Sequence, residues 1–331
     1  MVWIGLAVMI VLVLVIYLIV VLAGKNDAEE ASAKPRTYTQ EEVDALLAAA
    51  KDSARSEEAE RILSGIQANF ESGQATSRAL REFYPEHIVL ASDGRVRFYP
   101  IQEQLKQCTY SQEQLIVQEN GELQYTENGQ IVSEKGIDVS NHQGEIDWAA
   151  VAQDGVKFAV LRVGLRGYGT GKIVVDQQFE NNVKGALSNG IEVGVYFYSQ
   201  SVNKEEALEE AKLVLEQIAP YRITGPVVYD AEKVSDSRTS GLTGTERTDM
   251  AIAFCEAVAQ AGYRPMIYLN LDTAFTVFEL ERLEEYDKWL AHYTDEMYYP
   301  YEYEMWQYSE SGTVSGIKGK VDMNIRFRAW E

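Results

Sequence analysis

The chain has 331 residues, of which 46% are hydrophobic, and this is enough for one large domain and a smaller attachment. Lysine and arginine number 30 against 51 aspartates and glutamates, a formal net charge of -21, so the chain lacks the basic character of nucleic-acid-binding proteins. With 2 cysteines and 3 histidines, it shows no metal-ligand spacing.

An uncharged apolar helix is predicted at residues 1–24. The stretch from Val2 to Gly24 consists almost entirely of Val, Leu and Ile and is long enough to span a bilayer, which takes about 20 residues. It lacks the basic start and short apolar core of a signal peptide, so we predict an uncleaved anchor, although Ala31-Ser32-Ala33 offers a cleavage site. Basic residues between 25 and 36 would alone place the following chain in the cytoplasm. Long domains translocate largely regardless of charge, so the chemistry below decides the orientation.

A linker and a charged stalk helix are predicted at residues 25–83. Thr39, followed by Glu42, is a capping-box start. The apolar residues then recur at helical spacing, with a heavily charged opposite face. They are Val43, Leu46, Leu47, Ala50, Ala54, Ile62, Leu63, Ile66 and Phe70. Two interpretations are open: self-association of the stalk with another copy, or a solvated helix that lies on its own neighbour.

A small β-rich segment is predicted at residues 84–134. Its short strands are separated by hairpin-type turns at Ser92–Arg95, Glu119–Glu122 and Glu127–Gln130. The segment carries no recognisable chemistry. A spacer and an autonomous contact module are both consistent with it.

Strand-like and helical runs alternate from residue 135 to 331. The strands are predicted at 136–140, 158–163, 193–198, 226–232, 265–269, 288–292 and 303–308. The helices are predicted at 176–189, 204–218 and 245–262. This alternation predicts an α/β fold, a parallel TIM-like barrel with its functional groups at the C-terminal ends of the strands.

The predicted strand at 226–232 ends in two acids, Asp230 and Glu232. Alternate residues of a strand point the same way, so the two carboxyls are about 7 Å apart. Glycosidases cut with two carboxyls that flank one bond, and this spacing suits such a pair. An isolated Asp-x-Glu is more often a solvated pair, but Asp138 at the end of the first strand and Asp322 in the tail arrive at the same edge of the barrel.

The other side chains at this edge are polar or aromatic. They are Arg162, Tyr198, Tyr268, His292, Gln307 and Asn324. We expect Arg162 to pair with one of the acids, because an unpaired buried charge is costly. Clustered acids raise each other's pKa, and a glycosidase needs one acid protonated and one ionised, so we predict a raised pKa for Glu232.

Several other residues are predicted to be structural. Asp147 is expected to cap a turn or helix, and His142 and His292 to pack or to form hydrogen bonds. Trp289 and Trp306 are candidates for the core. Cys255 is expected to be a buried thiol, although a disulfide with Cys108 stays open.

Separate motifs between residues 135 and 331 resemble glycoside hydrolase family 25, the N-acetylmuramidase lysozymes. They are Gly136–Ser140, Gln143-Gly144, Ile146–Trp148, Gly194–Tyr198, Asp230–Glu232, Pro265–Tyr268, Met305–Tyr308 and Val321–Asn324. They occur in order and with family-like spacing. The resemblance does not extend to residues 1–134.

The resemblance implies an irregular (β/α) barrel that works without a metal or other cofactor and hydrolyses the β-1,4 bond between N-acetylmuramic acid and N-acetylglucosamine in peptidoglycan. By position, Glu232 matches the general acid, and Asp230 an acid that stabilises or orients the substrate's 2-acetamido group. Asp138 and Asp322 match the two remaining acids. A direct carboxylate nucleophile is the competing account. Tyr198, Tyr268, Gln307, Arg162 and Asn324 are expected to bind substrate.

These inferences predict a single-pass membrane protein whose catalytic domain is extracellular and faces the cell wall. The expected partners are peptidoglycan glycan strands and, through the N-terminal helix, the membrane. A non-hydrolytic peptidoglycan-binding barrel that acts as a wall scaffold is the alternative function. A third hypothesis is a structural role in which the stalk and the β-rich segment assemble a wall-spanning complex. The presence of all four acids favours the enzyme.

Overall fold

The computed structural model describes residues 39–73, 75–92 and 94–330. The predicted membrane span at 2–24 and the linker at 25–38 lie outside this described part. Within it, no helix combines the length and the apolar character needed to cross a bilayer. The chain divides into two compact units, the first ending at Asn69 and the second beginning at Phe70, and each is described by itself.

The predicted stalk is a single helix, α2, from Gln40 to Glu71. Its capping box is present: the N–H of Glu42 donates to Oγ1 of Thr39 at 3.2 Å, and the N–H of Thr39 donates to Oε2 of Glu42 at 2.8 Å. No residue of α2 is buried. Large apolar side chains of the predicted stripe stay accessible, and Leu46 and Leu63 are 57% and 67% exposed.

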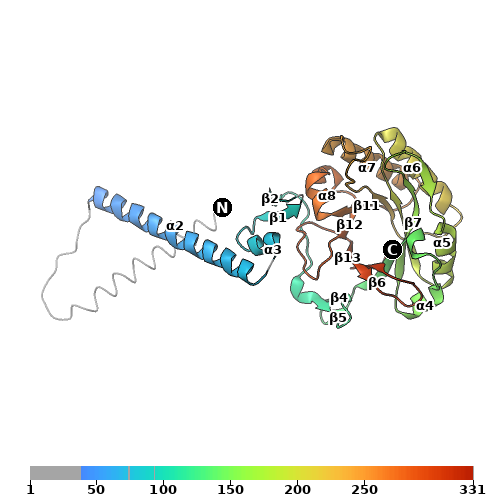
Figure 1. Ribbon diagram of the computed structural model, residues 1–331, viewed down its shortest axis with the longest axis horizontal. Coiled ribbons are helices and arrows are strands. Elements are labelled where there is room, and N and C mark those ends of the chain that lie inside the picture. The colour runs from blue at the N-terminus through green and yellow to red at the C-terminus, as the bar shows by residue number, and fades with distance from the viewer. Residues whose placement is uncertain (1–38, 74, 93, 331) are drawn as a thin grey trace. The chain divides into compact units, whose positions relative to one another are not determined.

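The second unit contains a closed barrel of eight strands, within the part of the chain that the structure describes (Figure 1). In spatial order they are β6 (Glu134–Val139), β7 (Phe158–Arg166), β9 (Glu192–Tyr198), β10 (Val227–Asp230), β11 (Pro265–Asn270), β12 (Asp287–Ala291), β13 (Met305–Gly312) and β14 (Val321–Arg326). Strand β8 (Ile173–Val175) adds an antiparallel edge to the end of β7. Pairing of β6 with both β7 and β14 closes the ring.

Strand β14 makes the barrel irregular. Strands β6, β7 and β9 to β13 run parallel around the barrel, as predicted, but β14 is antiparallel to both β13 and β6. The alternation of strands and helices predicts a parallel barrel with residues 321–324 in a tail, so it misses this reversed strand, whereas the irregular barrel implied by the family resemblance agrees with it. The reversal has a consequence for the site, because it brings the start of β14 to the edge where the other strands end.

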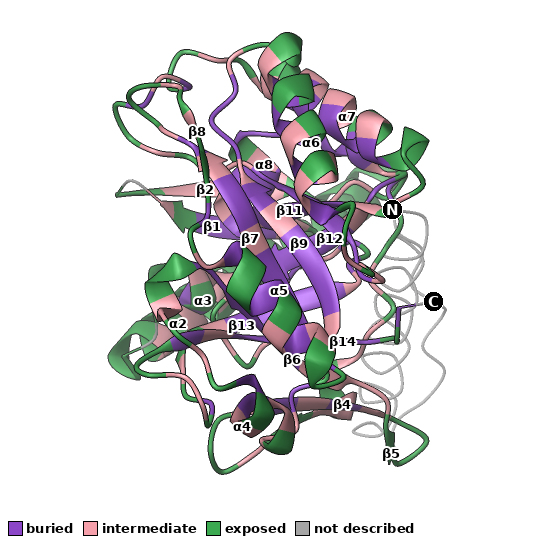
Figure 2. Cartoon of the chain, turned by 90° about the vertical axis from the view of Figure 1, so that its right-hand side faces the viewer, coloured by how far each residue is buried: buried purple, intermediate pink, exposed green. Residues whose placement is uncertain are grey.

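Helices lie on the outer side of the barrel, and their buried faces meet the strands (Figure 2). They are α4 (Trp148–Gln153), α5 (Phe179–Ser188), α6 (Lys204–Ile218), α7 (Gly244–Gln260) and α8 (Leu271–Thr276), with 3-10 turns at η2 (Asn141–Gln143) and η3 (Leu280–Leu283). Asp147 caps α4, as predicted, by accepting from the N–H groups of Ala149 and Ala150 at 3.1 Å.

The core has an inner and an outer part, because the side chains of each strand alternate between the barrel interior and the helices. Trp289 on β12 packs inside with Phe158 and Met266, and Trp306 belongs to the larger cluster beneath the helices. Both tryptophans are buried as expected. Cys255 on α7 is fully buried, and Cys108 and Cys255 are both free thiols.

The segment at 84–134 packs with the barrel in one compact unit. Helix α3 (Thr76–Arg81) leads into the hairpin β1 (His87–Ser92) and β2 (Arg95–Pro100), and η1 (Gln112–Gln114) into β3 (Leu115–Val117), β4 (Leu123–Glu127) and β5 (Gln130–Ile131). All three predicted turns join paired strands. Tyr125 belongs to the main core, and Tyr110 stacks on Phe327 with ring centres 3.8 Å apart.

Trp330 closes the end of the barrel where the parallel strands begin. A Cβ at Gly225, just before β10, would lie 2.3 Å from the Trp330 ring, so this close approach requires glycine. Arg326 lies 4.4 Å from the centre of the same ring and is 1% exposed. It pairs with Glu134 and Glu192, so its buried charge is compensated.

Candidate active site

A cavity of about 160 Å³ lies at the opposite end of the barrel, where the parallel strands end. All four predicted acids line it. Asp138 comes from β6 and Asp230 from the last position of β10, whereas Glu232 lies two residues beyond that strand. Asp322 stands opposite Asp138 in the antiparallel register of β14 and β6. The reversed strand therefore delivers the fourth carboxyl to the same edge as the other three.

Four of the five predicted binding residues also line the cavity, namely Arg162, Tyr198, Tyr268 and Gln307. The structure adds three aromatic residues that were not predicted to line it: Tyr196, Trp289 and Tyr293. Tyr196 lies two positions before Tyr198 on β9, so strand alternation alone could have found it. Tyr293 lies just after the end of β12. At this strand end the sequence analysis named its neighbour His292 as the side chain near the site.

Asn324 is the exception among the predicted binding residues. It is fully buried and does not line the cavity, so the expectation of direct substrate contact is corrected. Its carbonyl accepts the indole N–H of Trp289 at 2.8 Å, which fixes the amide so that Nδ2 donates to Oδ2 of Asp138 at 2.8 Å. Asn324 therefore orients the carboxyl of Asp138 from the buried side.

Gln307 approaches Asp138 from β13. Its Nε2 donates to Oδ2 of Asp138 at 2.7 Å, while its Oε1 accepts from the hydroxyls of Tyr268 at 2.8 Å and Tyr293 at 3.1 Å. Two N–H donors thus converge on one oxygen of Asp138. Such donors favour the ionised form of a carboxyl and hold its geometry.

Asp230 has a different environment. It is 5% exposed, and its Oδ1 is buried with no hydrogen-bond partner. Arg162 does not pair with any of the four acids, contrary to expectation. Its Nε donates to Oδ2 of Asp176 at 2.8 Å, and its Nη2 donates to Oδ1 of Asn141. Asp176 follows the edge strand β8, which pairs with β7 and which the sequence did not predict, so the partner was missed. The free oxygen of Asp230 is available to a donor that enters the cavity.

Burial raises the pKa of all four carboxyls, and their mutual repulsion adds to the effect. For Glu232 the main cause of the raised pKa is burial, followed by the charge of Asp322, which agrees with the predicted direction. The pKa of Asp322 rises to about 6 through burial and the neighbouring Glu310. The pKa of Asp230 is raised well above its ordinary value by burial and then by Glu232. The cavity thus disfavours ionisation of all four carboxyls at once.

The two histidines near this edge are not among the residues that line the cavity. His292 is mostly buried against the ring of Tyr298, and burial together with the charge of Arg81 lowers its pKa to about 4. It stays neutral near pH 7 and packs, as predicted. His142 is exposed in η2.

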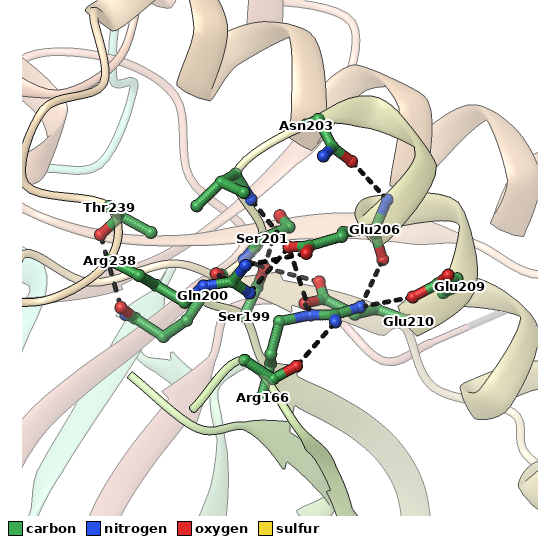
Figure 3. A network of polar contacts seen from close by, with 12 residues as sticks. Arg166, Ser199, Gln200, Ser201, Asn203, Glu206, Glu209, Glu210, Arg238 and Thr239 are labelled. Atoms are coloured by element: carbon green, nitrogen blue, oxygen red, sulfur yellow. Dashed lines mark hydrogen bonds and ion pairs between the residues drawn. The ribbon is translucent and has the colours of Figure 1, made fainter. Parts of the chain in front are cut away.

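A buried polar network supports the chain that follows Glu232 (Figure 3). Arg166 at the end of β7 is 4% exposed and donates through Nε to Glu210 of α6 at 2.6 Å. Arg238, in the loop after Glu232, donates both terminal nitrogens to Glu206 at 2.8 Å. The first ion pair joins β7 to α6 and the second joins the loop after β10 to α6, so Glu232 lies between a strand end and a loop that is held in place.

A closed α/β barrel with clustered carboxyls and aromatic rings at the strand ends is the type of site used by glycoside hydrolases. The sequence model of "Glycosyl hydrolases family 25" matches residues 137–317. The chain belongs to glycosyl hydrolases family 25 and is a glycoside hydrolase of the lysozyme type.

Relatives in sequence and in structure agree with this assignment. The uncharacterized protein YegX of Escherichia coli O6:H1 is 31% identical over 206 residues, which cover 57% of this chain and 68% of YegX. The autolytic lysozyme of Clostridium acetobutylicum is 24% identical over 195 residues, 57% of this chain and 55% of that protein. The modular autolysin LytC of Streptococcus pneumoniae, solved with a synthetic peptidoglycan ligand, shares the fold at a TM-score of 0.54 and 23% identity; the match covers 72% of this chain and 56% of LytC.

Proposed function

We propose that the protein is a membrane-anchored muramidase that cleaves the β-1,4 bond between N-acetylmuramic acid and N-acetylglucosamine in peptidoglycan. The observation that carries the proposal is the convergence of Asp138, Asp230, Glu232 and Asp322 on one aromatic cavity. The names of the autolytic lysozyme and of LytC with its peptidoglycan ligand support the choice of substrate.

Glu232 acts as the general acid in this proposal. Its raised pKa favours the protonated form that a general acid needs, and its position beyond β10 leaves it more accessible than Asp230. Donation of this proton to the glycosidic oxygen lets the leaving sugar depart as an alcohol.

Asp230 orients the 2-acetamido group of the substrate. Its Oδ1 has no hydrogen-bond partner among the residues that the structure describes, so it can accept the acetamido N–H, which directs the acetamido carbonyl oxygen toward the anomeric carbon. Burial and the charge of Asp322 raise the pKa of Asp138 to about 8, while the N–H donors of Gln307 and Asn324 favour its ionised form. In that form it adds negative potential where positive charge develops on the sugar ring. Asp322 sustains the raised pKa of Glu232.

The membrane attachment and the location outside the cell rest on the sequence of residues 2–24 and on the substrate, which lies in the wall. Protease treatment of intact cells tests both: we expect the catalytic unit to be cleaved from outside while the membrane stays closed.

We also propose that α2 pairs with a second copy of itself, since Val43, Leu47, Ala50 and Ala54 follow the alternating spacing of a coiled-coil seam. Sedimentation of the full-length chain should then show a dimer that Leu47→Glu dissociates.

The deciding experiment for activity mixes the full-length protein with purified peptidoglycan and identifies the released fragments by mass spectrometry. We expect new reducing ends on N-acetylmuramic acid, and a loss of at least about 1,000-fold in rate for Glu232→Gln. Glu145→Gln, which changes an exposed carboxyl in the loop after β6, is the matched control and should cut at the normal rate. Reducing ends on N-acetylglucosamine would contradict the bond assignment. Wall binding without cleavage by the unmodified protein would favour the scaffold function instead.

A further inference from the structure

The family match begins at residue 137, but the chain before it makes extensive contacts with one loop of the barrel. This is the β12–β13 loop, residues 292–304, which contains no helix and only an isolated bridge at Tyr301. It begins at the C-terminal end of β12, at the edge of the barrel that holds the acids. The contacting chain extends from α3 to η1, residues 78–112, and is called the N-terminal clamp below.

The first set of contacts joins α3 and β1 to the middle of the loop. The guanidinium of Arg81 lies 3.5 Å from the centre of the Tyr298 ring, a cation–π contact. Arg81 and Arg78 both form ion pairs with Glu296. The hydroxyl of Tyr298 accepts the backbone N–H of Val89 at 2.6 Å. The loop is thus held by charge, ring and backbone contacts from two elements of the clamp.

The second set holds the loop backbone on both sides of Tyr298. The side chain of Gln112 donates to the carbonyl of Asp295 at 3.0 Å and accepts the N–H of Met297 at 2.8 Å. The N–H of Cys108 donates to the carbonyl of Pro300 at 2.8 Å. The N–H of Glu302 donates to the carbonyl of Lys106 at 2.9 Å. A long surface loop without its own secondary structure is ordinarily mobile, and these bonds replace the missing internal ones.

The loop carries Tyr293 into the site. Tyr293 lies three residues before Glu296, lines the acidic cavity and is 50% exposed, so its ring forms part of the cavity mouth. Its hydroxyl contacts Oε1 of Gln307 at 3.1 Å, but Tyr268 holds the same oxygen at 2.8 Å. Displacement of Tyr293 would therefore alter the surface that a sugar meets and leave Gln307 and the acids in place.

We propose that the N-terminal clamp is a positioning element of the active site: it fixes the β12–β13 loop so that the Tyr293 ring is ready to stack on a bound sugar. The segment before the family domain then contributes to substrate binding instead of serving as a spacer. The proposed sugar contact rests on the proposed function, whereas the clamping of the loop does not.

The test uses the full-length protein with Arg81→Ala and Gln112→Ala, two changes that release the loop from different elements. With soluble uncross-linked glycan strands, we expect KM to rise about three- to ten-fold, which corresponds to the loss of one or two hydrogen bonds. We expect kcat and the pH profile to stay unchanged. Arg97→Ala is the matched control, because Arg97 donates to Ser92 within its own hairpin at 2.9 Å; it should leave KM unchanged. Gln112 is exposed, so Gln112→Ala gives a result even if Arg81→Ala does not fold.

Two further measurements separate positioning from general destabilisation. Hydrogen exchange at the amides of residues 293–299 should accelerate in both clamp variants, while exchange in β10 and β11 stays unchanged. In a Tyr293→Ala background, Arg81→Ala should cause no additional rise in KM, because both changes remove the same contact. An unchanged KM with normal exchange, or a full additional rise in the double variant, would overturn the proposal. If the unmodified protein cuts no glycan, the proposed function fails, and the exchange measurement alone decides whether the clamp holds the loop.

Discussion

The two ends of the barrel show opposite ways of treating buried charge. At the end where the parallel strands begin, Arg326 is nearly inaccessible, yet Glu134 and Glu192 compensate its charge and the Trp330 ring covers it. At the other end, Asp230 is just as buried and one of its oxygens has no partner. The first end stabilises the closed barrel. The second keeps an unfavourable group in place because a ligand can use it.

The largest effect is expected at the closed end. Trp330→Ala should lower the free energy of unfolding by about 3–5 kcal/mol, because it removes a large buried ring between Phe158 and Arg326 and leaves a cavity. Urea unfolding of the full-length protein measures this. Tyr168→Ala removes an aromatic ring that is 61% exposed and should cost little. A loss below about 1 kcal/mol for Trp330→Ala would show that the C-terminal ring does not close the barrel.

The next prediction is that replacement of Asp230 lowers activity but raises stability. Asp230→Asn should reduce kcat about 100-fold, because a neutral amide oxygen is a weaker acceptor for the acetamido N–H than a carboxylate oxygen. The same change should raise the free energy of unfolding by about 1–2 kcal/mol at pH 8, because it removes a carboxyl whose ionisation is unfavourable in the fold.

The pH dependence of this gain follows from the direction of the shift. A carboxyl whose folded pKa is raised contributes no penalty below its unfolded pKa, near 4, and destabilises the fold as pH rises toward its folded pKa. Asp230→Asn should therefore match the unmodified protein in stability at pH 4 and exceed it at pH 8. Equal stability at both values would contradict the raised pKa of Asp230.

The smallest predicted effect is on the titration of Glu232. Asp322 is the second cause of its raised pKa, after burial. Asp322→Asn should lower the pKa of Glu232, and carbon NMR of the carboxyl can follow this without any need for activity. Glu310 is the charged neighbour of Asp322 itself, so Glu310→Gln should lower the pKa of Asp322 more than that of Glu232. No movement in either variant would mean that burial alone sets these values.

The sequence predicted those parts of the fold that local patterns determine. Helix α6 occupies residues 204–218, as predicted, because Asn203 caps it and its apolar positions have one periodicity. Strands β6, β7 and β9 to β13 follow apolar runs, and three of the acids, Asp138, Asp230 and Glu232, lie at or just beyond the ends of such runs. All four predicted acids line the cavity, although their catalytic roles stay predictions.

Features that depend on distant partners were missed. The six residues of β14 do not by themselves indicate the direction of the strand. Its direction is set by pairing with β6, which lies at the other end of the barrel sequence. The burial of Asn324 depends on the same long-range closure. The packing of residues 84–134 against the barrel was invisible for the same reason, since its hydrogen bonds reach residues 295–302. The partner of Arg162 follows instead from the short edge strand β8, which the sequence did not predict.

The pairing of β14 with β6 also has a consequence for synthesis. The ring closes between residues 134–139 and 321–326, so neither a closed barrel nor its fourth acid exists until the ribosome has released that late strand. A partly translated chain holds Asp138, Asp230 and Glu232 on an open sheet, without Asp322 and without the Asn324 contact to Asp138. The hydrolytic site is therefore assembled last, and chains that terminate before residue 321 should be unable to act on a glycan.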